Sequence, residues 1–202
     1  MKNIPIIQNA VMLDKAIGEL QQGLADGLPW LDVAFGRAQR LAKKMPTGKT
    51  IYTPSVFCGG WQGHGNNDYI EVMPDSFIGN FCFFVVDDPE QIEWQQNAEM
   101  TKRAPFSIIF WFDCRELFND PKTRNTEYVK AQILDILNGR SGFLMQSGSI
   151  KINRIYERAD NIYRGFSHDE IDNQFLMHPF AGFRFEGIIE TETPCVLPDI
   201  NR

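Results

Sequence analysis

The stretch Ser107-Ile108-Ile109-Phe110-Trp111-Phe112 is apolar on both of its alternating faces. Successive side chains of a strand point to opposite sides of a sheet, so a strand that is apolar on both faces is typical of a position covered on both sides. This stretch is also rich in β-branched and aromatic residues, which are enriched in strands. It therefore predicts a central strand with Phe110 in the hydrophobic core.

Short β-rich segments with turn residues between them lie on both sides of this run. A mostly antiparallel sheet is the simplest arrangement of such segments. The predicted strands cover residues 50–58, 68–73, 81–86, 106–113, 149–156 and 183–193, and a β-bulge is predicted at Gly187 in the last of them.

Four segments have the apolar spacing or the capping residues of a helix. An amphipathic helix is predicted over 9–25, and a second helix, opened by Pro29 and ended by Pro46, would complete an N-terminal helical hairpin. Residues 126–137 predict a helix across the sheet, and Ser167 predicts a short helix to about residue 176. The prediction is one α+β domain over 1–202: the hairpin in 1–46, the sheet and its packing helices in 47–195, and a tail in 196–202.

Composition and charge fit a folded domain that does not grip nucleic acid. The 202 residues are 43% hydrophobic and 12% aromatic, which is enough apolar material for a substantial core. The formal net charge of -6 disfavours a surface for phosphate backbones. The start, Met1-Lys2-Asn3-Ile4-Pro5, lacks a signal-peptide run, and no stretch reaches the roughly 18 apolar residues of a membrane span. We therefore expect a cytoplasmic protein with no membrane partner.

The cysteines and histidines show no metal-ligand spacing. Cys58, Cys82, Cys114 and Cys195 contain no CxxC pair, and the histidines His64, His168 and His178 are not spaced as ligands with any of them. We expect four reduced thiols and no metal or other cofactor.

Three motifs have features of active sites, and each has a simpler interpretation. Pro46-Thr47-Gly48-Lys49-Thr50 ends like a phosphate-binding loop, but position 43 is lysine where that loop needs glycine, so it predicts a turn. Asp87-Asp88-Pro89-Glu90 follows an apolar strand and indicates a turn, with a metal site as the alternative. Asp113 is either the cap of the following turn or a catalytic carboxylate modulated by Arg115 or Glu116. Because the sequence places no histidine beside Cys114 and contains no GxSxG elbow, we expect no enzyme.

Two segments rich in polar and glycine residues contain tryptophan. The segment Gly59-Gly60-Trp61-Gln62-Gly63-His64-Gly65-Asn66-Asn67 is either a binding loop or a long hairpin connection. Trp94 lies in the segment 87–104. Exposed aromatic side chains often mark contact surfaces, so Trp61, His64 and Trp94 are the candidates for a subunit interface.

The order of these elements resembles that of head-to-tail connector and tail terminator proteins of tailed bacteriophages. The shared features are a helix before a β-sheet, a strand and helix of the Ile108-Phe110-Trp111 and Val129-Ile133-Leu137 kind, and a closing strand like Phe180-Ala181-Gly182-Phe183-Arg184-Phe185-Glu186-Gly187. The resemblance is one of layout over residues 50–195. The chain departs from shorter members of the family in its two-helix N-terminal extension and in the segment 87–104.

The resemblance implies a structural subunit of a phage or prophage virion, made and assembled in the host cytoplasm. Such a subunit forms a homo-oligomeric ring, usually a hexamer, at the end of the tail tube or at the head-tail junction. Its partners would be other neck or tail proteins, with DNA only as passing cargo, and the family has no catalytic residue. The alternative is a small-molecule enzyme or binding protein with a site around Asp87, Asp113 and residues 59–67, and polar side chains converging in one pocket would favour it. A third alternative is an adaptor that binds one partner through its N-terminal helices.

Overall fold

The elements of the fold follow one another as a helix, a group of strands, two further helices and a closing pair of strands around a last short helix. The computed structural model describes residues 5–7, 9–65, 68–74, 78–94, 100–118, 120, 122–139, 142–167 and 176–192. In chain order the described elements are α1 (Met12–Gly27), β1 (Val33–Lys44), β2 (Thr50–Phe57), the 3-10 turn η1 (Trp61–Gly63), β3 (Tyr69–Glu71), β4 (Phe81–Val86), β5 (Gln91–Trp94), β6 (Met100–Asp113), α2 (Cys114–Leu117), α3 (Thr126–Leu137), β7 (Ser149–Tyr156), α4 (Ala159–Ile162) and β8 (Phe180–Glu192).

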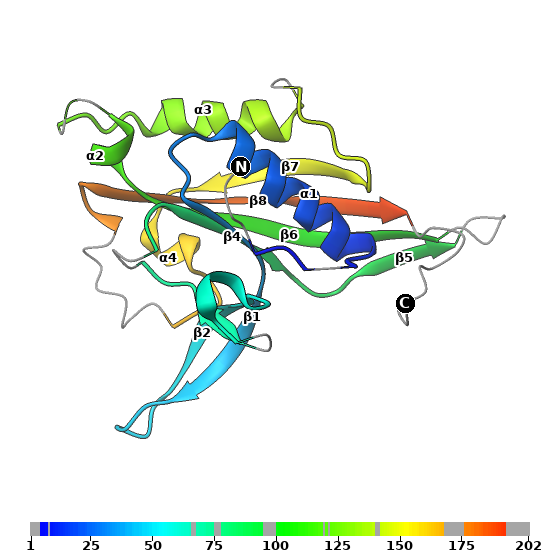
Figure 1. Cartoon of the computed structure of the whole chain (residues 1–202), viewed down its shortest axis with the longest axis horizontal. Coiled ribbons are helices and arrows are strands. Elements are labelled where there is room, and N and C mark those ends of the chain that lie inside the picture. The colour runs from blue at the N-terminus through cyan, green and yellow to red at the C-terminus, as the bar shows by residue number, and fades with distance from the viewer. Residues whose placement is uncertain are drawn as a thin grey trace.

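The described strands form one sheet, which confirms the predicted α+β class (Figure 1). Their order is β3-β2-β1-β4-β6-β8-β7, and β5 pairs with β6 off this path. The sheet is mixed rather than mostly antiparallel as predicted, because β1 runs parallel to β4. In the chain, β2 and β3 lie between β1 and β4. Strand β2 runs antiparallel to β1 and β3 runs antiparallel to β2, and the chain then enters β4 in the direction of β1.

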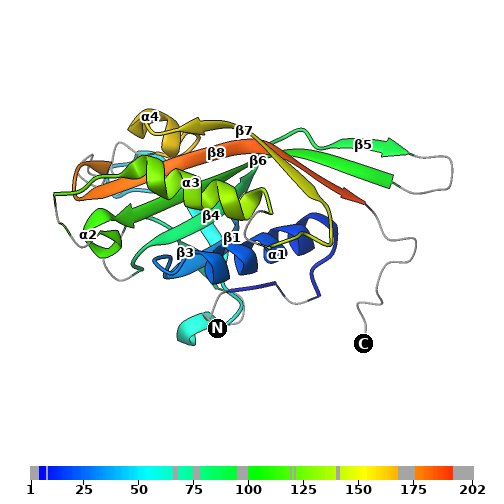
Figure 2. The same ribbon diagram turned by 90° about the horizontal axis from the view of Figure 1, so that it is seen from above.

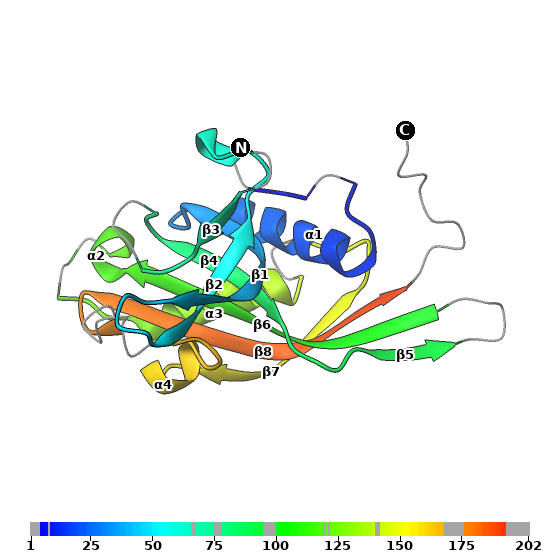
Figure 3. The same ribbon diagram turned by 90° about the horizontal axis from the view of Figure 1, so that it is seen from below.

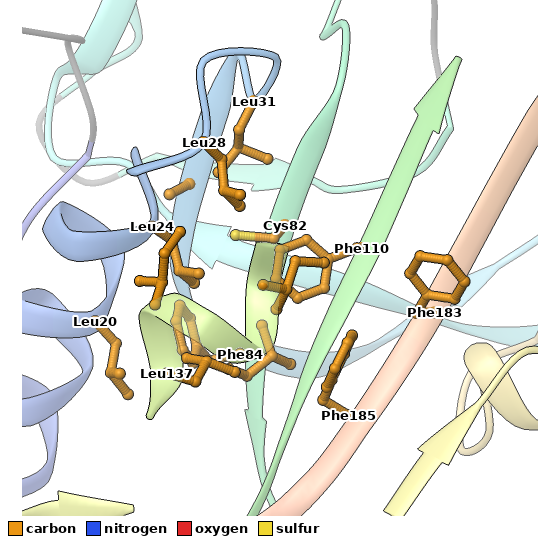
Figure 4. Packing of buried hydrophobic residues seen from close by; sticks show 14 of the residues in the cluster. Leu20, Leu24, Leu28, Leu31, Cys82, Phe84, Phe110, Leu137, Phe183 and Phe185 are labelled. Atoms are coloured by element: carbon orange, nitrogen blue, oxygen red, sulfur yellow. The ribbon is translucent and has the colours of Figure 1, made fainter. Parts of the chain in front are cut away.

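Strand β6 is buried on both faces at its centre, as its sequence predicts. Phe110 lies in the core cluster formed with α1 and α3, while Ile109 and Trp111 lie in a second cluster on the α4 side. Figures 2 and 3 show α1 and α3 on one side of the sheet and α4 on the other. Figure 4 shows Phe110 between Cys82 of β4 and Phe183 and Phe185 of β8. The apolar run is therefore a strand between two layers of side chains.

The first predicted helix is present, and the second is wrong. α1 buries a stripe of leucine and isoleucine against the sheet, but residues 29–46 contribute strand β1 instead of a helix. Val33 and Phe35 of β1 lie in the α4-side cluster, while Ala34 lies in the α1-side cluster. A short strand covered on both faces is an apolar run that periodicity does not distinguish from a buried helix. Gly36, which is disfavoured in a helix interior, was the available signal against helix.

A buried glutamine joins α1 to the start of β1. Gln21 is 3% exposed, and its Nε2 donates to the carbonyl oxygen of Ala34 at 3.0 Å and to that of Pro5 at 2.9 Å. The β1–β4 register shifts between Ala34 and Arg37, where the regular ladder is interrupted. The Gln21 amide therefore satisfies a backbone group that the irregular strand does not pair in the usual way.

The predicted bulge near Gly187 lies on the neighbouring strand. The β6–β8 register runs through Gly187 without a break, whereas the β7–β8 register shifts between Ile152 and Arg154. A Cβ at Gly187 would collide with the carbonyl oxygen of Lys151. Glycine is therefore required here because the β7 backbone comes very close to β8.

Helix α3 spans the predicted residues 126–137, although its N-cap is Asn125, whose Oδ1 accepts the N–H of Tyr128 at 3.2 Å. The short helix predicted from Ser167 to about residue 176 falls mostly outside the described residues. None of the helices that the structure describes combines the length and apolar character needed to span a bilayer.

Candidate subunit-interface site

Trp61 is a packing residue in the structure, so the expectation that it is exposed is wrong. It opens the turn η1 after β2 and is partly buried against the α4-side core cluster. Its ring meets the Phe35 ring edge-on, with 5.6 Å between ring centroids. The Trp61 N–H donates to the carbonyl oxygen of Cys58 at 3.0 Å. Trp61 therefore anchors the end of β2 on β1, which favours the hairpin-connection reading of residues 59–67.

His64 remains exposed at the end of this turn. Its backbone N–H donates to the carbonyl oxygen of Trp61 at 3.1 Å, and the chain then turns again at Gly65, whose carbonyl oxygen accepts the N–H of Asp68 at 3.1 Å. His64 therefore presents a polar side chain on a surface turn. His168, another histidine considered as a ligand, lies outside the described residues.

Trp94 is exposed, as predicted, and lies at the end of β5. Its side chain is 73% exposed, and Ile92, two residues before it on the same face of β5, is 53% exposed. β5 pairs along one side with β6, where Ile92 faces Lys102 and Trp94 faces Met100. Residues that face each other across a strand pair lie on the same side of the sheet. Ile92 and Trp94 thus continue the helix-covered face of β6 beyond the helices, where they lie open to solvent.

The structure does not bring Trp61 and Trp94 together. Trp61 packs next to Phe35 on the α4 side of the sheet. Strand β1 pairs there with β4 through Ala34 and Cys82, and Cys82 in turn faces Phe110 of β6. Trp94 instead faces Met100, which is ten residues from Phe110 along β6, or roughly 30 Å of strand. Among the three interface candidates, Trp94 therefore has the open surface that a contact residue needs.

Asp113 caps helix α2 at one end of β6. Its Oδ1 accepts the N–H of Arg115 at 2.9 Å, and its Oδ2 pairs with Nη2 of Arg115 at 2.5 Å. Burial by itself would raise the pKa of the Asp113 carboxyl, but the hydrogen bonds and charge of Arg115 outweigh it and hold this pKa below its usual value. The carboxylate is thus fixed in its charged form as a helix cap.

Asn80 ties this capped end to the rest of the sheet. It is 2% exposed, and its Oδ1 accepts the N–H of Asp113 at 2.8 Å. Its Nδ2 donates to Oε2 of Glu116 at 2.7 Å and to the carbonyl oxygen of Trp30 at 3.0 Å. The side chains that sequence reasoning considered as a modulated carboxylate site are therefore partners in a network that joins β4, β6 and α2.

Asp87 lies at the other end of the sheet. Its N–H donates to the carbonyl oxygen of Pro105 at 2.9 Å, and its Oδ2 lies 3.5 Å from Nη2 of the buried Arg184. Pro105 and Asp113 are eight residues apart on β6, which corresponds to about 27 Å of extended chain. The structure thus separates Asp87 from Asp113. In the described part of the chain, no group of three or more His, Cys, Asp or Glu side chains is placed to hold a metal ion.

The cysteines in the described residues are buried free thiols. Cys58, Cys82 and Cys114 are each at most 3% exposed, while Cys195 lies outside the described residues. Burial raises the pKa of the Cys114 thiol, which leaves little of the reactive thiolate near neutral pH.

We therefore expect the thiols of a Cys195→Ser variant to react slowly with a small aromatic disulfide in native buffer. In denaturant without reductant, the same reagent should titrate its three remaining thiols rapidly, and four in the parent. A fast native reaction at Cys114 would contradict its burial, and a titre below three would indicate a disulfide.

Sequence reasoning missed a basic hairpin formed by β1 and β2. Residues 33–57 contain Arg37, Arg40, Lys43, Lys44 and Lys49 and no aspartate or glutamate. This one-sided charge was visible in the sequence, but the helix predicted over 29–46 separated the two halves of the hairpin. The GKT segment is the turn of this hairpin, as predicted: the Met45 N–H donates to the Lys49 carbonyl oxygen at 2.8 Å, and Gly48 has a φ of 85°.

No protein-family model matches this sequence, and no curated protein matches it.

Proposed function

We propose that this chain is a structural subunit that assembles with copies of itself into a closed ring, of the kind that completes a phage neck or tail. The observation that carries the proposal is the exposed pair Ile92 and Trp94 on the edge strand β5. An edge strand with large apolar side chains favours pairing with another chain unless something covers it. Assembly with a second copy would provide that cover.

The shape of the subunit supports a head-to-tail arrangement. Figure 1 shows two projections in different directions: the β1–β2 hairpin leaves the sheet below, and β5 with the start of β6 extends past the helices on the right. Contacts between two different surfaces of identical subunits generate a ring when the rotation closes. The order of elements in the sequence, which resembles that of tail terminator proteins, supports placing this ring at the tail end or at the head-tail junction.

The test is the assembly state of the purified chain, alone and mixed with a candidate tail-tube protein. Light scattering and negative-stain images should show a ring in at least one of these conditions. Replacing Trp94 with alanine should weaken the self-association by about 2 kcal/mol, or roughly 30-fold in dissociation constant, if it is a central contact.

Leu144→Ala is the matched control, because Leu144 is 76% exposed but lies outside both projections. It should leave assembly unchanged. A strictly monomeric protein in both conditions, or turnover of a small metabolite, would contradict the proposed function.

A further inference from the structure

The β1–β2 hairpin forms a basic arm, defined here as residues 37–52. It carries all five basic residues of the segment 33–57 and no acidic one. Since the whole chain has a formal net charge of -6, the residues outside this segment have a net charge of -11. The charge of the molecule is thus strongly divided between one projecting hairpin and the rest.

The basic arm is held by strand pairing, and the outer half of β1 in it is open to solvent. Seven residue pairs, from Ala38 with Val56 to Lys44 with Thr50, join β1 to β2, and residues 39–44 are all exposed. Six residues of strand reach about 20 Å. The Arg40 guanidinium lies 3.9 Å from the centre of the Tyr52 ring, which holds part of the charge in place. Leu41 and Tyr52 are 43% and 37% exposed, so the arm also offers apolar contact area.

The opposite charge gathers at the β5 end of the sheet. This acidic end carries six carboxylates and three basic side chains, an excess of three negative charges: Asp87, Asp88, Glu90, Glu93, Glu190 and Glu192 against Lys102, Arg103 and Arg184. Glu93, Glu190 and Glu192 lie with Arg103 on the α4-side face of the sheet, where Arg103 Nε lies 2.5 Å from Glu190 and its Nη1 lies 3.1 Å from Glu93. Ile188, which is 42% exposed, lies on the same face as Glu190, while Ile92 and Trp94 lie on the opposite face of this end of the sheet.

We propose that the basic arm of one copy binds the acidic end of the next copy, so that this pair of surfaces forms the repeating contact of the ring. The proposal rests on the proposed function. Figures 1 and 3 show the arm and β5 projecting from different parts of one molecule, so they do not meet within a copy. Two complementary and different surfaces define a head-to-tail contact. Opposite charges would set its register and speed the encounter, while Tyr52, on the face of the arm that carries Arg40 and Lys44, and Ile188 on the acidic face would supply buried apolar area.

A second copy of the chain suits the arm better than duplex DNA. Phosphate backbones favour a basic surface, but here a net charge of -11 on the remaining residues would repel them as they approach the arm. The exposed apolar residues of both surfaces also fit a protein interface.

The decisive experiment uses two charge-reversed variants that should assemble together and not alone. The first carries Arg40→Glu, Lys44→Glu and Lys49→Glu in the arm, which gives the arm a net charge of -1, and the second carries Asp88→Lys and Glu192→Lys, which gives the acidic end a net charge of +1. All five side chains are exposed, so the variants should keep the fold, which circular dichroism and thermal melts check. In each variant the arm and the acidic end have like charge, so its self-association should weaken roughly 100-fold. In an equimolar mixture, every contact between unlike variants again joins opposite charges, and assembly should return.

Three comparisons separate the outcomes. Exposed reversals outside both surfaces, Lys122→Glu with Arg158→Glu, should assemble like the parent, and assembly of the parent should weaken as salt rises. If the parent forms rings and each reversed variant also forms them alone, or the mixture fails to assemble, the arm contact is wrong while the ring proposal stands. If the parent never assembles, the proposed function itself fails. If arm reversal leaves assembly intact but removes binding to a 20-base-pair duplex at physiological salt, the arm is a nucleic-acid surface and the inference is overturned.

Discussion

Replacing Phe110 with alanine is expected to lower the free energy of unfolding by about 3–5 kcal/mol. Phe110 has no exposed surface and lies in the middle of β6, between Cys82 of β4 and Phe183 of β8. Its ring centroid lies 5.6 Å from that of Phe185 and 6.5 Å from that of Trp30. Truncation removes these contacts and leaves a cavity that a strand hydrogen-bonded on both sides cannot easily collapse.

Urea denaturation followed by far-ultraviolet circular dichroism measures this loss. Leu144→Ala is the control, since it also removes a large apolar side chain but from a site that is 76% exposed, and its midpoint should stay close to that of the parent. An equal midpoint for Phe110→Ala and the parent would show that Phe110 is not a core residue. The test concerns the fold alone and is independent of assembly if it is performed on the monomer.

Replacing Arg184 with alanine is expected to cost a similar amount, about 3–5 kcal/mol, because the side chain is a buried charge with several partners. Arg184 is 1% exposed. Its Nε donates to Oε1 of Glu186 at 2.9 Å and its Nη1 to the carbonyl oxygen of Arg164 at 3.1 Å, while Nη2 lies 3.5 Å from Asp87. Burial lowers the pKa of this guanidinium, and the Glu186 and Asp87 carboxylates act against that shift. The alanine variant loses these partners and leaves a cavity.

Two further variants separate charge from packing. Arg184→Met keeps most of the buried volume, and Glu186 still has Arg164 at 2.5 Å, so methionine should recover part of the lost stability. Arg103→Ala is the control, because Arg103 also pairs with two carboxylates but its side chain is 41% exposed, so its removal should cost far less. If Arg184→Ala and Arg103→Ala gave the same small change in midpoint, the Arg184 cluster would have no special role in stability.

Segments whose pattern matches one secondary structure alone were predictable. Residues 81–86, 149–156 and 126–137 were assigned as two strands and a helix with the bounds that the structure has. The failure at 29–46 has a local cause, because β1 is buried on both faces in its first half and exposed in its second half. A strand of that kind shows no regular alternation, and apolar residues at positions 31, 35 and 38 match a helix by chance.

The candidate site residues were also predictable only in part. Exposure of Trp94 followed from its polar neighbours, but the same reasoning failed for Trp61, because Phe35 lies 26 residues away in the sequence and reaches Trp61 through the β1–β2 pairing. Likewise, Asp87 follows one strand and Asp113 ends another, yet the antiparallel β4–β6 pairing puts them at opposite ends of the sheet.

The sequence by itself determined the α+β class, the central position of 107–112, helix α3 and the uneven distribution of charge, since each of these depends on residues close together in the chain. The tertiary structure alone decided that β1 is a strand parallel to β4, that residues 37–52 project as one basic arm, and that Asp87, Glu93, Glu190 and Glu192 lie on one face of the sheet. These features depend on strand pairing between distant segments, and such pairing is set by the burial of the whole sheet rather than by local preference.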